Sequence, residues 1–153
     1  MSTDHGPYIA AVQEALIHAG FETLNEHAED EDPRGGGIQL DPRSPAAADW
    51  FANWDEVWLG WNEDRGWALV CTEELAGGEP KTFTFDSHLP RLAAPVSVVR
   101  MACGHAGVSV QAIDALPEPA IPDADFPGHS FLDDDPVFEQ ALARYREPSC
   151  PRS

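Results

Sequence analysis

Two pairs of neighbouring residues carry the side chains that nucleophilic catalysis needs. Ser87 precedes His88, and Cys103 lies two residues before His105. Adjacent side chains on a strand point to opposite faces, and side chains two apart on a helix diverge by about 200°. Neither pair is preorganised by its spacing, and no third residue that would orient the base can be identified. We therefore predict no catalytic residue, and an enzyme is the weaker hypothesis.

The sequence also contains no recognisable metal-binding or cofactor-binding motif. Four possible metal ligands are spread along the chain and could meet only if the fold brings them together: Cys71, Cys103, His88 and His105. The chain contains no HExxH and no CxxC, the spacings that would bring such ligands together locally. We predict no metal and no cofactor.

The tryptophans are concentrated in one short stretch of the chain. The stretch 50–67 holds all five tryptophans of the chain, and Trp50, Trp54 and Trp58 lie four apart, so a helical turn there would place them on one stripe. Aromatic walls bind planar or cationic ligands, and nearby carboxylates favour a cation. These three rings form a candidate binding face together with three residues of the C-terminal region: Phe138, Leu142 and Tyr145.

Two helices are expected to support this region. Residues 7–20 place Tyr8, Val12 and Leu16 on one apolar stripe, with Pro7 suited to the first turn and Gly20 to a left-handed exit. Residues 96–105 form the second predicted helix, whose apolar stripe contains Val96, Val99, Ala102, Cys103 and Ala106.

The strands are predicted from alternation of apolar and polar residues. Residues 55–61 and the segment that begins at Trp67 form a central hairpin around a turn at 62–66. Val57, Leu59 and Trp61 share one of its faces, and Trp58 lies on the other. Shorter strands are expected at 21–27 and 38–40, and an edge strand at 81–86. The acidic run at 29–32 and the three glycines at 35–37 are predicted to form a loop.

These elements predict an α+β fold. Its antiparallel sheet has about four to five strands centred on the tryptophan-rich hairpin, packed by the N-terminal helix and the second helix. We assign residues 1–112 to this domain and residues 113–153 to an acidic, proline-rich C-terminal tail with a short amphipathic helix at 136–146. That helix is too short to be stable alone, so it packs on its own sheet or lies in a groove of another chain.

The net negative charge limits the kinds of macromolecule that the chain is expected to bind. The chain has 27 acidic and 9 basic residues and a net charge of −18, which disfavours direct contact with nucleic acid or an anionic membrane. It favours a protein partner with a basic surface, although acidity also serves solubility alone. The N-terminus lacks a secretion signal, and the three cysteines do not suggest a disulfide framework, so a cytoplasmic location is expected.

The leading functional hypothesis is a non-enzymatic interaction or regulatory module that binds a protein through its acidic surface, its tryptophan-rich face, or both. One alternative is a small enzyme or small-molecule-binding protein of a specialised pathway with a tryptophan-lined pocket. Another is an inhibitor that mimics nucleic acid and occupies a basic protein site. A homodimer that pairs through a sheet face or an edge strand is the third alternative.

Three motifs carry a resemblance to a known family. HGPYIAAV at 5–12, IQLDP at 38–42, and EVWLGW at 56–61 followed by Gly66-Trp67 resemble a family of small actinobacterial, Streptomyces-type proteins catalogued as a domain of unknown function. The resemblance extends over about residues 5–108 and leaves the acidic tail outside. It implies a bacterial cytoplasmic origin and a compact α+β module, and it supplies no catalytic residues.

Overall fold

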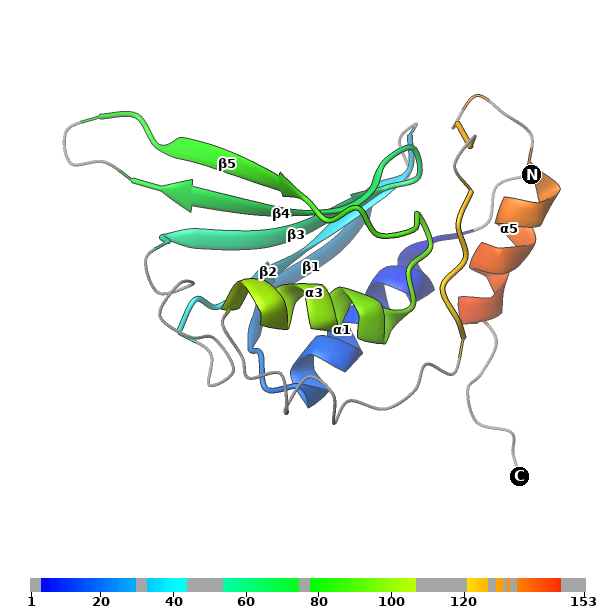
Figure 1. The fold of residues 1–153 in the computed structure, drawn as a ribbon, viewed down its shortest axis with the longest axis horizontal. Coiled ribbons are helices and arrows are strands. Elements are labelled where there is room, and N and C mark those ends of the chain that lie inside the picture. Colours follow the sequence, from blue (N-terminus) through cyan, green and yellow to red (C-terminus); the bar gives the residue numbers. More distant parts are fainter. Residues whose placement is uncertain are drawn as a thin grey trace.

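A five-stranded antiparallel sheet with two helices on one face forms the body of the molecule, and a third helix lies at one end (Figure 1). The computed structural model describes residues 4–29, 33–43, 54–74, 78–106, 121–126, 129–130, 132 and 135–146. This architecture confirms the predicted α+β fold.

The strands follow one another across the sheet in chain order. They are β1 (Thr23–Glu29), β2 (Gly35–Leu40), β3 (Glu56–Asn62), β4 (Gly66–Glu73) and β5 (Lys81–Asp86). The tryptophan-rich hairpin β3–β4 is central, as predicted, and Trp61 pairs with Trp67 across it. Strand β5 is an edge strand, also as predicted.

The inner face of the sheet carries the core. Eight strand residues there are buried: Ile38, Leu40, Val57, Leu59, Trp61, Trp67, Leu69 and Cys71. They pack against α1 (Gly6–His18) and α3 (Pro95–Ala106), which also pack against each other. The Trp67 indole donates to the Tyr8 hydroxyl at 2.9 Å, and that hydroxyl donates to the Ala93 carbonyl at 2.7 Å. This chain of hydrogen bonds ties β4, α1 and the approach to α3 together.

Both predicted helices are confirmed. Helix α1 buries Tyr8, Val12 and Leu16 of the predicted stripe, and Gly20 follows it with a positive φ of 104°. A left-handed residue at that point suits glycine, which has no Cβ to clash. Helix α3 buries the whole stripe predicted for it, together with Val98.

The prediction for residues 35–37 was wrong. These glycines lie in β2 and pair with both β1 and β3 instead of forming a loop. A Cβ on Gly36 would lie 2.6 Å from the His27 carbonyl oxygen and 3.0 Å from the Ile9 side chain. The absence of a side chain therefore allows α1 to lie close against the sheet.

The C-terminal segment packs back onto its own chain. Ala124 and Leu92 form an antiparallel bridge, and α5 (Pro136–Ala143) continues into the 3-10 turn η1 (Arg144–Arg146). The Tyr145 ring packs edge-on against Tyr8 in α1, with centroids 4.8 Å apart. Of the two packing hypotheses for this helix, contact with its own domain agrees with the structure, although the contact is with the α1 end and not with Trp54 or Trp58.

Candidate functional site

The six residues of the predicted binding face do not share one surface. Trp54 lies on the inner side of the sheet against Phe83, with ring centroids 5.4 Å apart, whereas Trp58 lies on the outer side. Three others lie at the α5 end, where Phe138 and Leu142 are fully buried and Tyr145 is half-buried. Trp50 lies outside the described residues.

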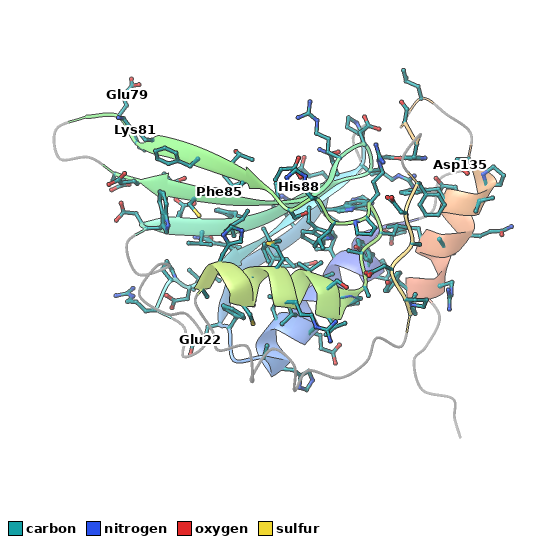
Figure 2. The ribbon with its side chains drawn as sticks, in the orientation of Figure 1. Glu22, Glu79, Lys81, Phe85, His88 and Asp135 are labelled. Carbon is teal, nitrogen blue, oxygen red and sulfur yellow. The ribbon has the colours of Figure 1, made fainter. Side chains whose placement is uncertain are left out.

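The pair Ser87 and His88 is not arranged for catalysis. The Ser87 hydroxyl donates to the Trp67 carbonyl at 2.6 Å and accepts the Leu89 amide at 3.1 Å, so it stabilises the turn after β5. The His88 side chain is 86% exposed (labelled in Figure 2) and lies 3.9 Å from Asp86. The hydroxyl hydrogen of Ser87 is directed at a carbonyl and not at the imidazole.

The buried thiols are equally unsuited to nucleophilic chemistry. Burial raises the pKa of Cys71 to about 12 and also raises the pKa of Cys103. A thiol must ionise to attack a substrate, so both groups are inert near neutral pH. His105 packs against Phe85 with ring centroids 5.8 Å apart. Within the part of the chain that the structure describes, no three His, Cys, Asp or Glu side chains form a cluster that could hold a metal ion.

The outer face of the sheet is the first surface that could bind a partner. None of the described helices lies over this face, because α1 and α3 both cover the opposite one (Figure 1). The register places Trp58 in the middle strand, between Gln39 of β2 and Val70 of β4. His27 and Thr84 lie farther out, on β1 and β5.

Trp58 is held in a defined position on this face. Its indole nitrogen donates to Glu56 at 2.7 Å, and its ring meets the His27 ring edge-on at 5.6 Å. A Cβ on Gly37 would lie 3.1 Å from both the Trp58 ring and the His27 ring, so the two rings lie directly over that glycine. The Trp58 side chain is only partly buried, and an aromatic surface is left at the centre of the outer face.

Charge on the outer face has one predominant sign. The ionisable residues that the five strands direct to this face are Glu29, Glu56, Asp86 and His27. His27 lies 2.9 Å from Glu29. No lysine or arginine of the described strands points to this face, since Lys81 is in register with Glu73 and its neighbour Thr82 points outward. The outer face therefore combines an aromatic centre with carboxylates.

A buried charge network at the α5 end is the second notable site. The Arg34 guanidinium donates to both carboxylate oxygens of Glu63 at 2.9 Å, and the Arg34 amide adds a third hydrogen bond at 2.7 Å. Arg34 also donates to Glu139 of α5, at 2.9 Å from Nη1 and 2.5 Å from Nη2. The Arg34 side chain is 8% exposed and that of Glu63 is 3% exposed, so this is an interior ion pair.

His129 completes this network. Its side chain is 1% exposed, and its two ring nitrogens lie 3.1 Å from Glu63 and 3.3 Å from Asp135. The imidazole stacks on Phe138 with centroids 3.8 Å apart. Asp135, at the amino-terminal end of α5 in Figure 2, also caps that helix by accepting the Phe138 amide.

The network shifts the acidity of its members. Burial alone would raise the pKa of Glu63, but hydrogen bonds from the Arg34 side chain and amide and from His129 lower it to about 2. Hydrogen bonding to Glu63 raises the pKa of Arg34 despite burial. The amide of Phe138, and then His129, lower the pKa of Asp135. Glu63, Arg34 and Asp135 therefore stay ionised near neutral pH.

No short sequence motif carries this network, so the sequence alone did not predict it. Arg34 and Glu63 are 29 residues apart, and Arg34 and Glu139 are 105 apart. Each member is of a type that is normally solvent-exposed, and the acidic composition offers many carboxylates to choose from. Only the fold distinguishes these residues from the others.

No helix in the described part of the chain is long and apolar enough to cross a membrane. No curated protein and no solved structure is significantly similar to the chain. A family model does match residues 8–104, which span α1 through most of α3 and end before the C-terminal segment. The chain belongs to this family, DUF6292, a family of unknown function.

Proposed function

We propose that this protein is a non-enzymatic interaction module of a bacterial, actinobacterial cytoplasm, and that it binds a basic segment of another protein across the outer face of its sheet. The observation that carries the proposal is the partly exposed Trp58 ring among the carboxylates of Glu29, Glu56 and Asp86. The net charge of −18 extends the same preference to long range.

The chemistry of this surface favours an arginine-containing partner. A guanidinium stacks on the face of an indole ring and can donate at the same time to a neighbouring carboxylate. Glu56, which already accepts from the Trp58 nitrogen, stands at the edge of that ring. Such a contact at an exposed site contributes about 0.5–1 kcal/mol, so several along one segment are needed for useful affinity.

The enzyme alternative has less support. A tryptophan-lined pocket would require Trp58 or Trp61 to meet His88 or His105. Trp61 is instead buried against His5 and Tyr8, and Trp58 lies on the opposite side of the sheet from the helices. The histidine nearest to Trp58 is His27, whose own neighbour is Glu29.

A titration with a synthetic peptide of four Arg-Ser repeats tests the proposal. Backbone amide shifts recorded at low salt should change along the outer-facing residues of β1, β3 and β5, with the largest changes next to Trp58. Trp58→Ala should weaken binding about two- to fivefold, which is the loss of one exposed cation–π contact. Glu56→Gln should weaken it by a similar factor and reduce its salt dependence.

Phe83→Ala is the matched control. Phe83 is also a partly exposed aromatic strand residue, 41% accessible, but it lies on the inner side beside Trp54. Its truncation should leave peptide affinity unchanged. Shifts spread evenly over Glu14 of α1 and the acidic residues of the loops, or equal losses in Trp58→Ala and Phe83→Ala, would refute binding at the outer face.

Nucleic-acid mimicry is a special case of the same proposal, in which the basic segment is itself a nucleic-acid site. The hypothesis rests on the acidic runs 29–32 and 133–135, of which 30–32 and 133–134 lie outside the described residues. Competition between DNA and this protein for an isolated partner would distinguish the special case from the general one.

A further inference from the structure

We infer that the C-terminal segment, of which the structure describes 129–130, 132 and 135–146, is a detachable ligand of the module to which it is attached, and that the proton on His129 holds it in place. The site that receives it is made by Arg34, directly before β2, by Glu63, directly after β3, and by Tyr8 from α1. The segment contributes His129, α5 and Tyr145. The inference concerns the α5 end of the molecule and is independent of binding at the outer face.

The contacts of the His129 imidazole determine its protonation state. Both ring nitrogens of His129 face carboxylate oxygens, Glu63 on one side and Asp135 on the other. An ionised carboxylate only accepts hydrogen bonds, and a neutral imidazole donates from one nitrogen only. Both contacts are satisfied together only when His129 is an imidazolium. The geometry therefore assigns a positive charge to this buried ring.

The charge balance around the His129 ring depends on this proton. With His129 protonated, its charge and that of Arg34 oppose the three carboxylates of Glu63, Asp135 and Glu139. Loss of the proton leaves Arg34 as the only cation among these five groups and turns a nitrogen lone pair toward a carboxylate. A buried charge without its partner is strongly destabilising, so docking weakens when the proton is lost.

The surroundings of the His129 ring also include one aromatic side chain and, one contact farther away, two arginines. Phe138 stacks on it, and the Arg34 guanidinium lies 5.7 Å from the Phe138 centroid. Arg91 donates to the carbonyl of Phe126, and the His129 amide donates to the same carbonyl. Among the described residues in these contacts, His129 is the only histidine, and histidine is the side-chain type that most readily gains or loses a proton around neutral pH.

Two tyrosines at the α5 end are also buried. Burial raises the pKa of Tyr145 to about 12 and raises the pKa of Tyr8 as well. Both therefore stay neutral between pH 6 and pH 9. Loss of the His129 proton is the event expected to loosen α5 as the pH rises.

Detachment would remove specific contacts and leave others intact. Phe138 and Leu142 are fully buried by docking, and Tyr145 covers the Tyr8 ring. Arg34 would lose Glu139 but keep Glu63, because Glu63 belongs to the β3–β4 connection and not to the segment. The module would then present a guanidinium beside an apolar surface.

Amide hydrogen exchange of the full-length chain tests the inference. Protection factors, corrected for the intrinsic effect of pH, should fall at least tenfold in α5 between pH 6 and pH 9. Those of β3 and β4 should stay constant. In His129→Gln, a neutral side chain with one amide donor group, protection in α5 should be low at pH 6 and should not change with pH.

His27→Gln is the matched control, because His27 is also a histidine beside a carboxylate but is exposed on the outer face. It should keep the wild-type pH response. Nitrogen NMR of the histidine rings gives a second measurement that does not depend on any variant: both His129 nitrogens should carry a proton at pH 6. A neutral ring at pH 6, an unchanged α5 at pH 9, or the same response in His129→Gln as in wild type would each overturn the inference.

Discussion

Replacing Arg34 with methionine should lower the free energy of unfolding by about 3–5 kcal/mol at pH 7. The substitution keeps most of the apolar stem and removes the guanidinium. Glu63 then remains as a carboxylate that is 3% exposed and has lost two side-chain hydrogen bonds. The cost arises because this buried carboxylate keeps only the contact with His129 and the backbone amide of residue 34, and only in small part from lost packing.

The pH dependence identifies the cause. In the wild type the pKa of Glu63 falls from 4.5 to about 2 on folding. A lowered carboxylate pKa contributes stability that is present above the unfolded value and is lost as the pH falls toward the folded value. Linkage gives a loss of about 1 kcal/mol at pH 4 and about 2 kcal/mol at pH 3 from Glu63 alone.

In Arg34→Met the side chain that lowers this pKa most is gone, so protonation of Glu63 should cost much less stability than in the wild type. The difference in unfolding free energy between wild type and Arg34→Met should therefore shrink by about 1 kcal/mol or more between pH 7 and pH 4. Urea denaturation followed by tryptophan fluorescence measures this difference, because Trp61 and Trp67 are both buried in the core.

Two further variants sharpen the measurement. Glu63→Gln should remove the same acid-sensitive contribution, and the double variant should cost less than the sum of the two single variants because neither charge is left alone. Arg43→Met is the control: Arg43 is 90% exposed and lies 3.8 Å from Asp41, so its loss should cost at most about 0.5 kcal/mol. If Arg34→Met has a similarly small cost, or if its loss of unfolding free energy does not vary with pH, then Arg34 and Glu63 do not form an interior charge pair.

Other consequences of the structure can be measured with the same methods. Gly36→Ala should destabilise the protein by about 1–3 kcal/mol, because its Cβ would collide with the neighbouring strand, whereas Gly60→Ala, whose Cβ meets nothing within 4 Å, should change stability by less than about 1 kcal/mol. Leu142→Ala should cost about 2–5 kcal/mol if α5 unfolds together with the sheet, and equal denaturation midpoints for variant and wild type would show that α5 separates before the sheet unfolds. Cys71 and Cys103 should react with a thiol reagent at pH 8 only after denaturant is added, and prompt labelling of either in the folded protein would contradict their raised pKa and burial.

Local sequence patterns predicted most of the fold. The helical stripe at Tyr8, Val12 and Leu16 and the alternation at Val57, Leu59 and Trp61 each reflect burial of one face of an element, which the sequence records directly. The edge strand β5 was predicted at the bounds that the structure shows, Lys81–Asp86. These predictions succeeded because each rests on residues within one element.

The predictions that were wrong concern residues whose positions depend on contacts with other segments of the chain. Gly36 belongs to a strand because Ile9 and β1 lie close to it, and three successive glycines alone resemble a turn. Trp54 and Trp58 were grouped by a helical spacing, but β3 begins at Glu56 and places Trp58 on the face opposite to Trp54. The network around Arg34 depends on contacts between distant segments and leaves no local pattern.

The strand order has a consequence for how the molecule assembles. Each strand pairs with the one before it in the chain, so the sheet can grow by successive hairpins without a long crossover. Arg34 and Glu63 meet when β2 and β3 pair, whereas His129 and Glu139 arrive only with the last part of the chain. During synthesis the sheet can therefore form first, with α5 docking in a later step. A slow kinetic phase confined to the α5 end is the expected signature of that order.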